Sequence, residues 1–144
     1  MTAGRICTGI RMSRPVLRAG ADGKRRDDPK GKSLLDYGCG KGRVDFFLSA
    51  QTRCRSIGVE YDDRIYAKAV ENKKAAVSGA RTEFVLESAE NFPVPAEVDR
   101  VYFFNPFSLE ILRKAMTRLL ESYYENPREI QLFFITRRML ISRI

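Results

Sequence analysis

Residues 34–42 read L-L-D-Y-G-C-G-K-G, and this stretch decides the fold. An apolar strand that runs into a glycine-rich turn and then into a helical pattern is typical of the first unit of a parallel α/β sheet. Glycines there let the backbone turn sharply and let a ligand approach the main chain closely. The spacing is GxGxG, so it matches neither the GxGxxG of pyrophosphate-binding dinucleotide folds nor the GxxxxGK(S/T) of a P-loop.

Alternating strand and helix patterns follow this turn. We expect strands over 33–37, 55–61, 82–86, 100–104 and 129–135. Helices are expected from 43 to about 50, from Asp62 or Asp63 to Gly79, and from Ser108 to Asn126. Strands that alternate with helices pair in parallel through right-handed crossovers. The chain is therefore predicted to be an α/β protein with a Rossmann-like, doubly wound parallel sheet of about five strands in three layers.

The apolar faces of the second and third helices follow from helical spacing. The second helix is expected to bury Ile65, Ala69, Ala76 and Val77. The third is expected to bury Leu109, Leu112, Met116, Leu119, Leu120 and Tyr123.

Length and composition exclude several classes of protein. The chain has 144 residues, enough for one domain with a single core. It contains no histidine, which excludes histidine bases, histidine metal ligands and the usual hydrolase triads. Three widely spaced cysteines give neither a disulfide framework nor a zinc pattern, so we expect no metal site and a reducing, cytoplasmic location. No apolar run is long enough to cross a membrane.

The excess positive charge is confined to the two ends of the chain. The formal net charge is +8, of which residues 1–32 carry +6 and residues 135–144 carry +3, while residues 33–134 carry −1. A nucleic-acid-binding face normally includes basic residues of the folded elements. Nucleic acid is therefore expected only as a substrate, and a basic nucleic-acid-binding protein remains the weaker alternative.

Two acidic residues flank the glycine loop at positions suited to a ligand. Asp36 lies two positions before Gly38, and Glu60 ends the strand at 55–61. A carboxylate at the end of this strand can accept hydrogen bonds from both hydroxyls of an adenosine ribose. The alternative is a tight turn between strand and helix with an ordinary capping acid.

Three segments together resemble a known family. They read L-L-D-Y-G-C-G-K-G-R-V, G-V-E-Y-D and F-F-N-P-F-S, and they occur in order within about residues 33–134. They are similar to class I S-adenosylmethionine-dependent methyltransferases, especially the small bacterial type with a DYGCGKG loop and an FNPF motif. The resemblance implies that the loop at 38–42 wraps the methionine part of S-adenosylmethionine, and that Glu60 binds its ribose.

The cofactor residues that the resemblance implies form one set around the loop and the next two strand ends. Ser88 and Ala89 match the place where the family contacts adenine, and Tyr61 is a candidate for stacking on it. The full set is Asp36, Tyr37, Gly38, Cys39, Gly40, Gly42, Glu60, Tyr61, Ser88 and Ala89.

Asn105, Pro106 and Phe107, after the strand at 100–104, are the candidate catalytic residues. The resemblance places them where the methyl group is transferred. Because the sulfonium of the cofactor is already an activated electrophile, the protein mainly has to align the acceptor and exclude water. The motif is similar to the NPP(Y/F) of amino-group methyltransferases, which favours an amino nitrogen in an otherwise unknown acceptor. The alternative is that Asn-Pro only terminates the strand.

The ends of the chain depart from this family. Its members usually add an N-terminal helical segment and a C-terminal antiparallel hairpin, whereas residues 1–32 show no regular pattern and residues 135–144 form a short basic tail. Codons for residues 4–15 can read K-D-M-H-R-N-P-Y-E-P-T in a shifted frame, so we hypothesise frameshifted, truncated ends. On this hypothesis the outer edge of the strand at 129–135 is unpaired and prone to association. An inactive remnant that at most binds the cofactor is then the alternative function.

Overall fold

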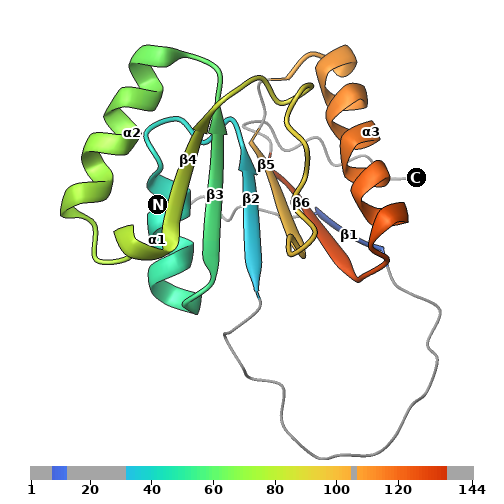
Figure 1. The fold of residues 1–144 in the computed structure, drawn as a ribbon, viewed down its shortest axis with the longest axis horizontal. Coiled ribbons are helices and arrows are strands. Elements are labelled where there is room, and N and C mark those ends of the chain that lie inside the picture. The colour runs from blue at the N-terminus through green and yellow to red at the C-terminus, as the bar shows by residue number, and fades with distance from the viewer. Residues whose placement is uncertain (1–7, 13–31, 105–106, 136–144) are drawn as a thin grey trace, which may run out of the picture.

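A computed structural model of the chain describes residues 8–12, 32–104 and 107–135 (Figure 1). The strands are β1 (Thr8–Met12), β2 (Ser33–Tyr37), β3 (Arg55–Glu60), β4 (Thr82–Leu86), β5 (Arg100–Phe104) and β6 (Ile130–Ile135). The helices are α1 (Arg43–Thr52), α2 (Asp63–Ala75) and α3 (Leu109–Glu125), with a short 3-10 turn, η1 (Gly79–Arg81).

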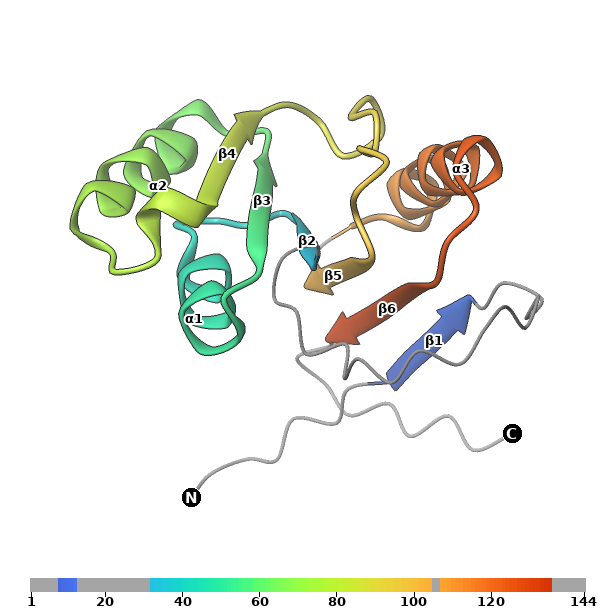
Figure 2. The same ribbon diagram turned by 60° about the horizontal axis from the view of Figure 1, so that its bottom comes forward.

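The sheet has six strands in the order β1-β6-β5-β2-β3-β4. The five strands from β2 to β6 pair in parallel, which confirms the predicted Rossmann-like sheet. β2 lies between β3 and β5, so the chain reverses its direction across the sheet after β4. Helices α1 and α2 cover one face and α3 covers the other (Figures 1 and 2). Ligands of such sheets bind beyond the carboxyl end of the strands at this reversal, which here is the end of β2.

The prediction that the outer edge of the fifth parallel strand is unpaired is wrong. β1 pairs with β6 in the antiparallel direction, with Thr8 opposite Phe134 and Met12 opposite Ile130. Residues 1–32 were expected to contain no regular element, yet five of them form this strand. The pairing satisfies main-chain groups that an exposed edge would leave open. The rest of the supposed frameshifted ends, residues 1–7, 13–31 and 136–144, lies outside the described residues.

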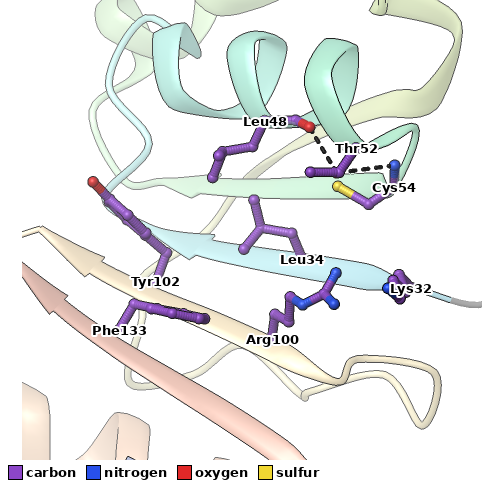
Figure 3. Close-up of a pocket in the computed structure, with 8 residues that line it drawn as sticks. All are labelled: Lys32, Leu34, Leu48, Thr52, Cys54, Arg100, Tyr102 and Phe133. Atoms are coloured by element: carbon purple, nitrogen blue, oxygen red, sulfur yellow. Dashed lines mark hydrogen bonds between the residues drawn. The ribbon is translucent and has the colours of Figure 1, made fainter. Parts of the chain in front are cut away.

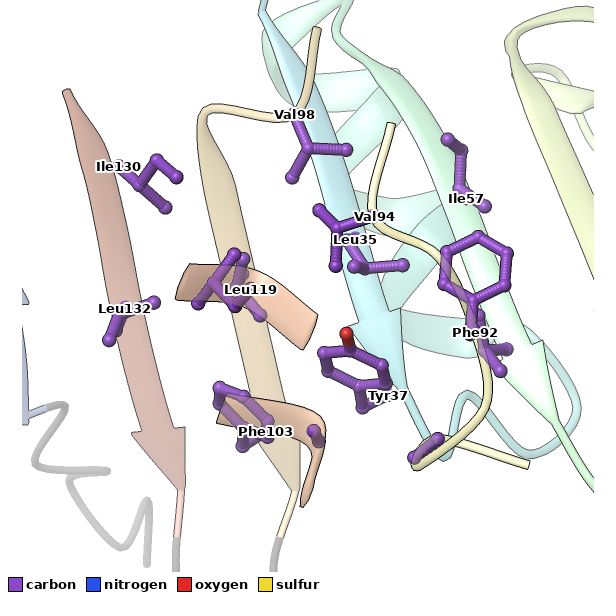
Figure 4. Close-up of a cluster of buried hydrophobic side chains, with 14 residues drawn as sticks. Leu35, Tyr37, Ile57, Phe92, Val94, Val98, Phe103, Leu119, Ile130 and Leu132 are labelled. Atoms are coloured by element: carbon purple, nitrogen blue, oxygen red, sulfur yellow. The ribbon is translucent and has the colours of Figure 1, made fainter. Parts of the chain in front are cut away.

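The larger core lies between the sheet and α3 (Figure 4). Leu35 and Tyr37 of β2 point to this side, and Ala115 and Leu119 of α3 pack there with no exposed surface. Tyr37 stacks on Phe103 with ring centroids 5.1 Å apart. Because side chains alternate along a strand, Leu34 and Asp36 point to the opposite face, toward α1. The face of β2 toward α3 thus carries the larger core, and the face toward α1 carries a smaller apolar cluster at Leu34 and the region under the glycine loop at Asp36.

Two of the predicted helix faces need correction. Helix α2 ends at Ala75, not at Gly79, and the side chain of Val77 is 94% exposed because it follows the end of the helix. Gly79 instead allows a close chain approach, since a Cβ there would lie 2.2 Å from the carbonyl oxygen of Lys73. Leu109, the first residue of α3, is 72% exposed and takes no part in the core.

The predicted helix starts are confirmed by their caps. The Asp62 carboxylate accepts hydrogen bonds from the backbone N–H groups of Arg64 and Ile65, at 2.9 and 3.2 Å. The Ser108 hydroxyl accepts one from the N–H of Ile111. Such caps satisfy donors that the first turn of a helix cannot pair internally. Among the helices of the described residues, none has the length and apolar character that spanning a membrane requires.

Candidate functional site

The glycine loop turns at the carboxyl end of β2 through three left-handed residues. Gly38, Gly40 and Gly42 have φ values of 72°, 58° and 83°, a region that side chains disfavour. The N–H groups of Gly38 and Cys39 both donate to the carbonyl oxygen of Val59 on β3, at 2.9 and 3.1 Å. The loop is therefore fixed against the end of the neighbouring strand, at the edge where a ligand is expected.

Glu60 holds the loop from the last position of β3. Its Oε2 accepts a hydrogen bond of 3.0 Å from the N–H of Gly40, and its Oε1 accepts from the N–H groups of Tyr61 and Asp62. The residue is only 6% exposed. The sequence placed Glu60 beside the loop, and the structure adds that its carboxylate is bonded to the main chain. The proposed contact of Glu60 with ribose hydroxyls stays a prediction.

A second buried acid lies under the loop next to Asp36. Asp45, on the first turn of α1, has no exposed surface and accepts a hydrogen bond from the Ser56 hydroxyl of β3. The carboxyl group of Asp36 lies within hydrogen-bonding reach of Asp45, and its Oδ1 has no partner although it is buried. Burial is the main cause that raises the pKa of Asp36 well above its usual value, and the charges of Asp45 and Glu60 add to it. Burial likewise raises the pKa of Asp45, to about 6.

The sequence analysis missed Asp45. Its signal was present as a polar stripe on α1, because Asp45, Ser49 and Thr52 recur at helical spacing. Asp45 and Ser49 are the buried residues of this helix. A buried polar stripe on a short helix indicates hydrogen-bonded partners across the interface. Ser49 finds one in the carbonyl oxygen of Cys54, and Asp45 finds Ser56.

Cys39 packs against Gly58 of β3, the first residue of the G-V-E-Y-D segment. A Cβ on Gly58 would lie 2.8 Å from both the Cβ and the Sγ of Cys39, and 2.7 Å from Cδ1 of Phe84. Only a glycine at this position of β3 leaves room for the loop. Burial, followed by the nearby carboxylates, raises the pKa of the Cys39 thiol, so the thiol stays neutral. Cys39 therefore acts as a packing residue in the loop.

The other expected cofactor residues fall into two groups. The Tyr37 side chain lies in the core on the α3 face, where burial raises its pKa, so only its main chain is available at the loop. Tyr61 is 76% exposed beside Glu60, and a flat exposed ring there is available for stacking. Ser88 and Ala89 follow β4 next to Glu60, because the N–H of Glu87 donates to the carbonyl oxygen of Glu60 at 3.0 Å.

Phe107 connects the F-F-N-P-F-S segment with the glycine loop. Its Cζ lies 3.3 Å from the position that a Cβ on Gly38 would take. The ring therefore covers the start of the glycine loop. Asn105 and Pro106, the other two candidate catalytic residues, lie outside the described residues.

An apolar cavity of about 330 Å³ lies apart from this site (Figure 3). It is lined by Lys32, Leu34, Leu48, Thr52, Cys54, Arg100, Tyr102 and Phe133. Lys32 precedes β2 and Arg100 begins β5, so the cavity lies toward the amino ends of the strands and the loop lies at their carboxyl ends. It is therefore not the place where the loop would hold a ligand. The described residues contain no group of His, Cys, Asp and Glu side chains that could hold a metal ion.

Comparison with known proteins agrees with this geometry. The profile of a family described as "Methyltransferase domain" matches residues 34–126, from β2 to the end of α3. The chain belongs to this family. The matched methyltransferase domain includes the glycine loop, Glu60 and the motif at 105–107. A search of curated protein sequences found no match.

Solved structures share the fold of this methyltransferase domain. An RNA methyltransferase from Salinibacter ruber in complex with S-adenosyl-L-homocysteine is 24% identical, with a TM-score of 0.57 over 66% of this chain and 60% of that one. The glycopeptide N-methyltransferase MtfA complexed with S-adenosylmethionine is 17% identical, with a TM-score of 0.55 over 63% and 42%. The cyclase SpnF is 21% identical, with a TM-score of 0.58 over 64% and 35%. The chain thus spans between about a third and three fifths of the length of these proteins.

Proposed function

We propose that this chain binds S-adenosylmethionine at the glycine loop and transfers its methyl group to an acceptor. The observation that carries this proposal is the hydrogen bond between the Glu60 carboxylate and the N–H of Gly40, in a member of the methyltransferase family. It joins the first two of the three segments on which the resemblance rests, at the reversal of the sheet. Two of the similar structures hold S-adenosylmethionine or its demethylated product, which supports the same cofactor here.

The residues around the loop fit this cofactor chemically. The left-handed glycines leave the main chain open to the methionine part. The unpartnered, buried Oδ1 of Asp36 offers an acceptor two residues before the loop. Glu60 has lone pairs beyond those used by its backbone donors, so it can also accept from ribose hydroxyls. Tyr61, Ser88 and Ala89 lie at the next strand ends, where the adenine is expected.

Methyl transfer from this cofactor needs little chemistry from the protein. When bound, the cofactor supplies a methyl group on a positively charged sulfur. We infer that Asn105, Pro106 and Phe107 position the acceptor, with the side-chain oxygen of Asn105 accepting a hydrogen bond from an amino group. That bond would direct the nitrogen lone pair toward the methyl group, and the Phe107 ring over Gly38 would exclude water.

Calorimetric titration with S-adenosylhomocysteine tests cofactor binding. Glu60→Ala should weaken binding by about 1–3 kcal/mol, because ribose hydroxyls would lose a partner in a partly desolvated site. Glu83→Ala is the matched control, since Glu83 is an exposed carboxylate on β4 paired with Arg55. Equal affinities of wild type and Glu60→Ala would contradict the assignment. Preference for NAD over S-adenosylhomocysteine would indicate a dehydrogenase instead.

Methyl transfer itself is tested with radiolabelled S-adenosylmethionine and a panel of amino-bearing acceptors. This assay is needed in addition to the binding test, because the same fold occurs in a cyclase. Asn105→Ala should lower the rate of transfer much more than the affinity for S-adenosylhomocysteine, because Asn105 is proposed to contact only the acceptor. Equal losses of rate and affinity would make Asn105 a structural residue. Binding without transfer to any acceptor would favour the cofactor-binding remnant.

A further inference from the structure

The acid pair formed by Asp36 and Asp45 is buried between the sheet and α1, directly below the glycine loop. Asp36 is 1% exposed and Asp45 is completely buried. Asp36 lies opposite Gly58 on β3 and Tyr102 on β5, two positions before Gly38. Ser56, on the same face of β3 as Gly58, donates a hydrogen bond from its hydroxyl group to Oδ1 of Asp45. The pair is thus supported from α1 and β3 and reaches the loop through β2.

Two interacting carboxyl groups in a buried place resist being ionised together. This favours one proton on the pair at neutral pH. The hydrogen bond from Ser56 stabilises the charged form of Asp45, so Asp45 carries the negative charge and Asp36 carries the proton. Oδ1 of Asp36 and Oδ2 of Asp45 are both buried without a hydrogen-bond partner. A buried acceptor without a partner is unfavourable by about 1–3 kcal/mol, which a suitable donor would recover.

The other groups that face the pair do not supply that donor. From β3, Glu60 adds negative charge to the surroundings of Asp36, and its carboxylate already accepts from the loop. From the loop, the neutral thiol of Cys39 is directed to the carbonyl oxygen of Gly40. The cations nearest in sequence, Lys41 and Arg43, are exposed, and Arg100 of β5 lies opposite Leu34 at the other end of β2. The surroundings of the pair are therefore negative.

We propose that Asp45 is a positioning residue for cofactor binding: it holds Asp36 through a shared proton, and this proton leaves when the ammonium group of the ligand bonds to Asp36. This inference rests on the proposed function and adds a residue that touches no ligand. Protons and charges balance in this step. The ligand enters with its ammonium charge, Asp36 gives its proton to the solvent and becomes a carboxylate, and the ammonium neutralises that new charge. Binding is thus accompanied by release of up to one proton.

Titration calorimetry of the whole chain with S-adenosylhomocysteine measures this proton directly. The titration is run at about pH 5.5–6.5 in two buffers of different ionisation enthalpy, below the range in which α-amino groups lose their protons. The wild type should release a proton, and its affinity should rise with pH by up to tenfold per unit. Asp45→Asn keeps the shape of the side chain and removes its charge, which lowers the pKa of Asp36, although burial still raises it. This variant should release less of a proton than the wild type and show a weaker dependence of affinity on pH.

Two controls separate this effect from general ones. Glu83→Gln removes an exposed carboxylate of β4 and should keep the proton release of the wild type. The ligand 5′-methylthioadenosine lacks the ammonium group, and it should bind the wild type without releasing a proton. This second control needs no variant, so it tests whether the ammonium group displaces the proton even if Asp45→Asn fails to fold.

The outcomes distinguish the inference from the function on which it rests. No binding of S-adenosylhomocysteine would overturn the proposed function and this inference with it. Binding of S-adenosylhomocysteine without proton release by the wild type would overturn the role of the acid pair and leave the cofactor assignment standing. The same proton release in folded Asp45→Asn as in the wild type would overturn the role of Asp45.

Discussion

Gly58→Ala should displace the glycine loop, although Gly58 lies on β3 and not in the loop itself. Gly58 lies in the middle of β3, opposite Asp36 of β2 and Phe84 of β4. A methyl group at this position would lie 2.8 Å from the Cβ and the Sγ of Cys39 and 2.7 Å from Cδ1 of Phe84. Since Cys39 is held in the loop between Gly38 and Gly40, the loop has to move.

The size of the effect follows from packing, because Gly58 is not among the residues with a left-handed backbone. Contacts below 3.0 Å with Cys39 and Phe84 force both side chains away from a packed position. Inserting a methyl group into such a place is destabilising by about 1–3 kcal/mol. We expect about 2 kcal/mol here, together with weaker binding of S-adenosylhomocysteine.

Urea denaturation of Gly58→Ala, Cys39→Gly and the double variant tests the reasoning. Cys39→Gly removes two of the three close contacts, so Gly58→Ala should be less destabilising in that background, with a coupling of at least about 0.5 kcal/mol. Gly40→Ala is the control, because a Cβ there meets no atom within 4 Å and only its φ of +58° is unfavourable. A loss below about 0.5 kcal/mol for Gly58→Ala, or strict additivity with Cys39→Gly, would refute this account of the packing.

Two further predictions concern the stability of the fold. Arg128→Met should lower the free energy of unfolding by about 2–4 kcal/mol. Its guanidinium donates hydrogen bonds to four main-chain carbonyl oxygens, which would lose them: those of Val98, Ser122, Asn126 and Pro95. A loss below about 1 kcal/mol in urea denaturation would contradict this prediction. Because the pKa values of Asp36 and Asp45 are raised, the folded chain binds a proton that the unfolded chain has released above about pH 5. The free energy of unfolding should therefore fall as pH rises from about 5 to 8, by up to about 1.4 kcal/mol per pH unit. Thermal melting over this range measures the slope, and an equal slope in Asp45→Asn would contradict the contribution of Asp45 to the raised pKa of Asp36.

The sequence by itself determined the parallel core of this protein. Strand and helix patterns are local, since each depends on a few consecutive residues and their period. The five strands from β2 to β6 and the three helices were therefore predicted with errors of a few residues at their ends. The caps at Asp62 and Ser108 were predicted for the same reason, because a cap acts within one turn of the helix.

The placement of Glu60 at the loop was also within reach of the sequence. Parallel strands end at the same edge of a sheet, so the last residue of β3 must lie near the turn that follows β2. What its carboxylate bonds to was not predictable, because hydrogen bonds to Gly40, Tyr61 and Asp62 depend on the course of the main chain in three dimensions.

Only the tertiary structure decided the features that need partners distant in sequence. Strand β1 has no clear pattern of its own, and it forms because β6, more than a hundred residues later, offers an edge. The sequence does not show the partners of Asp45 and Gly58: the first is buried against Asp36 and Ser56, and the second receives Cys39. Local periodicity sets which residues form strands and helices, whereas close packing between elements sets which glycine must stay a glycine and which acid keeps a proton.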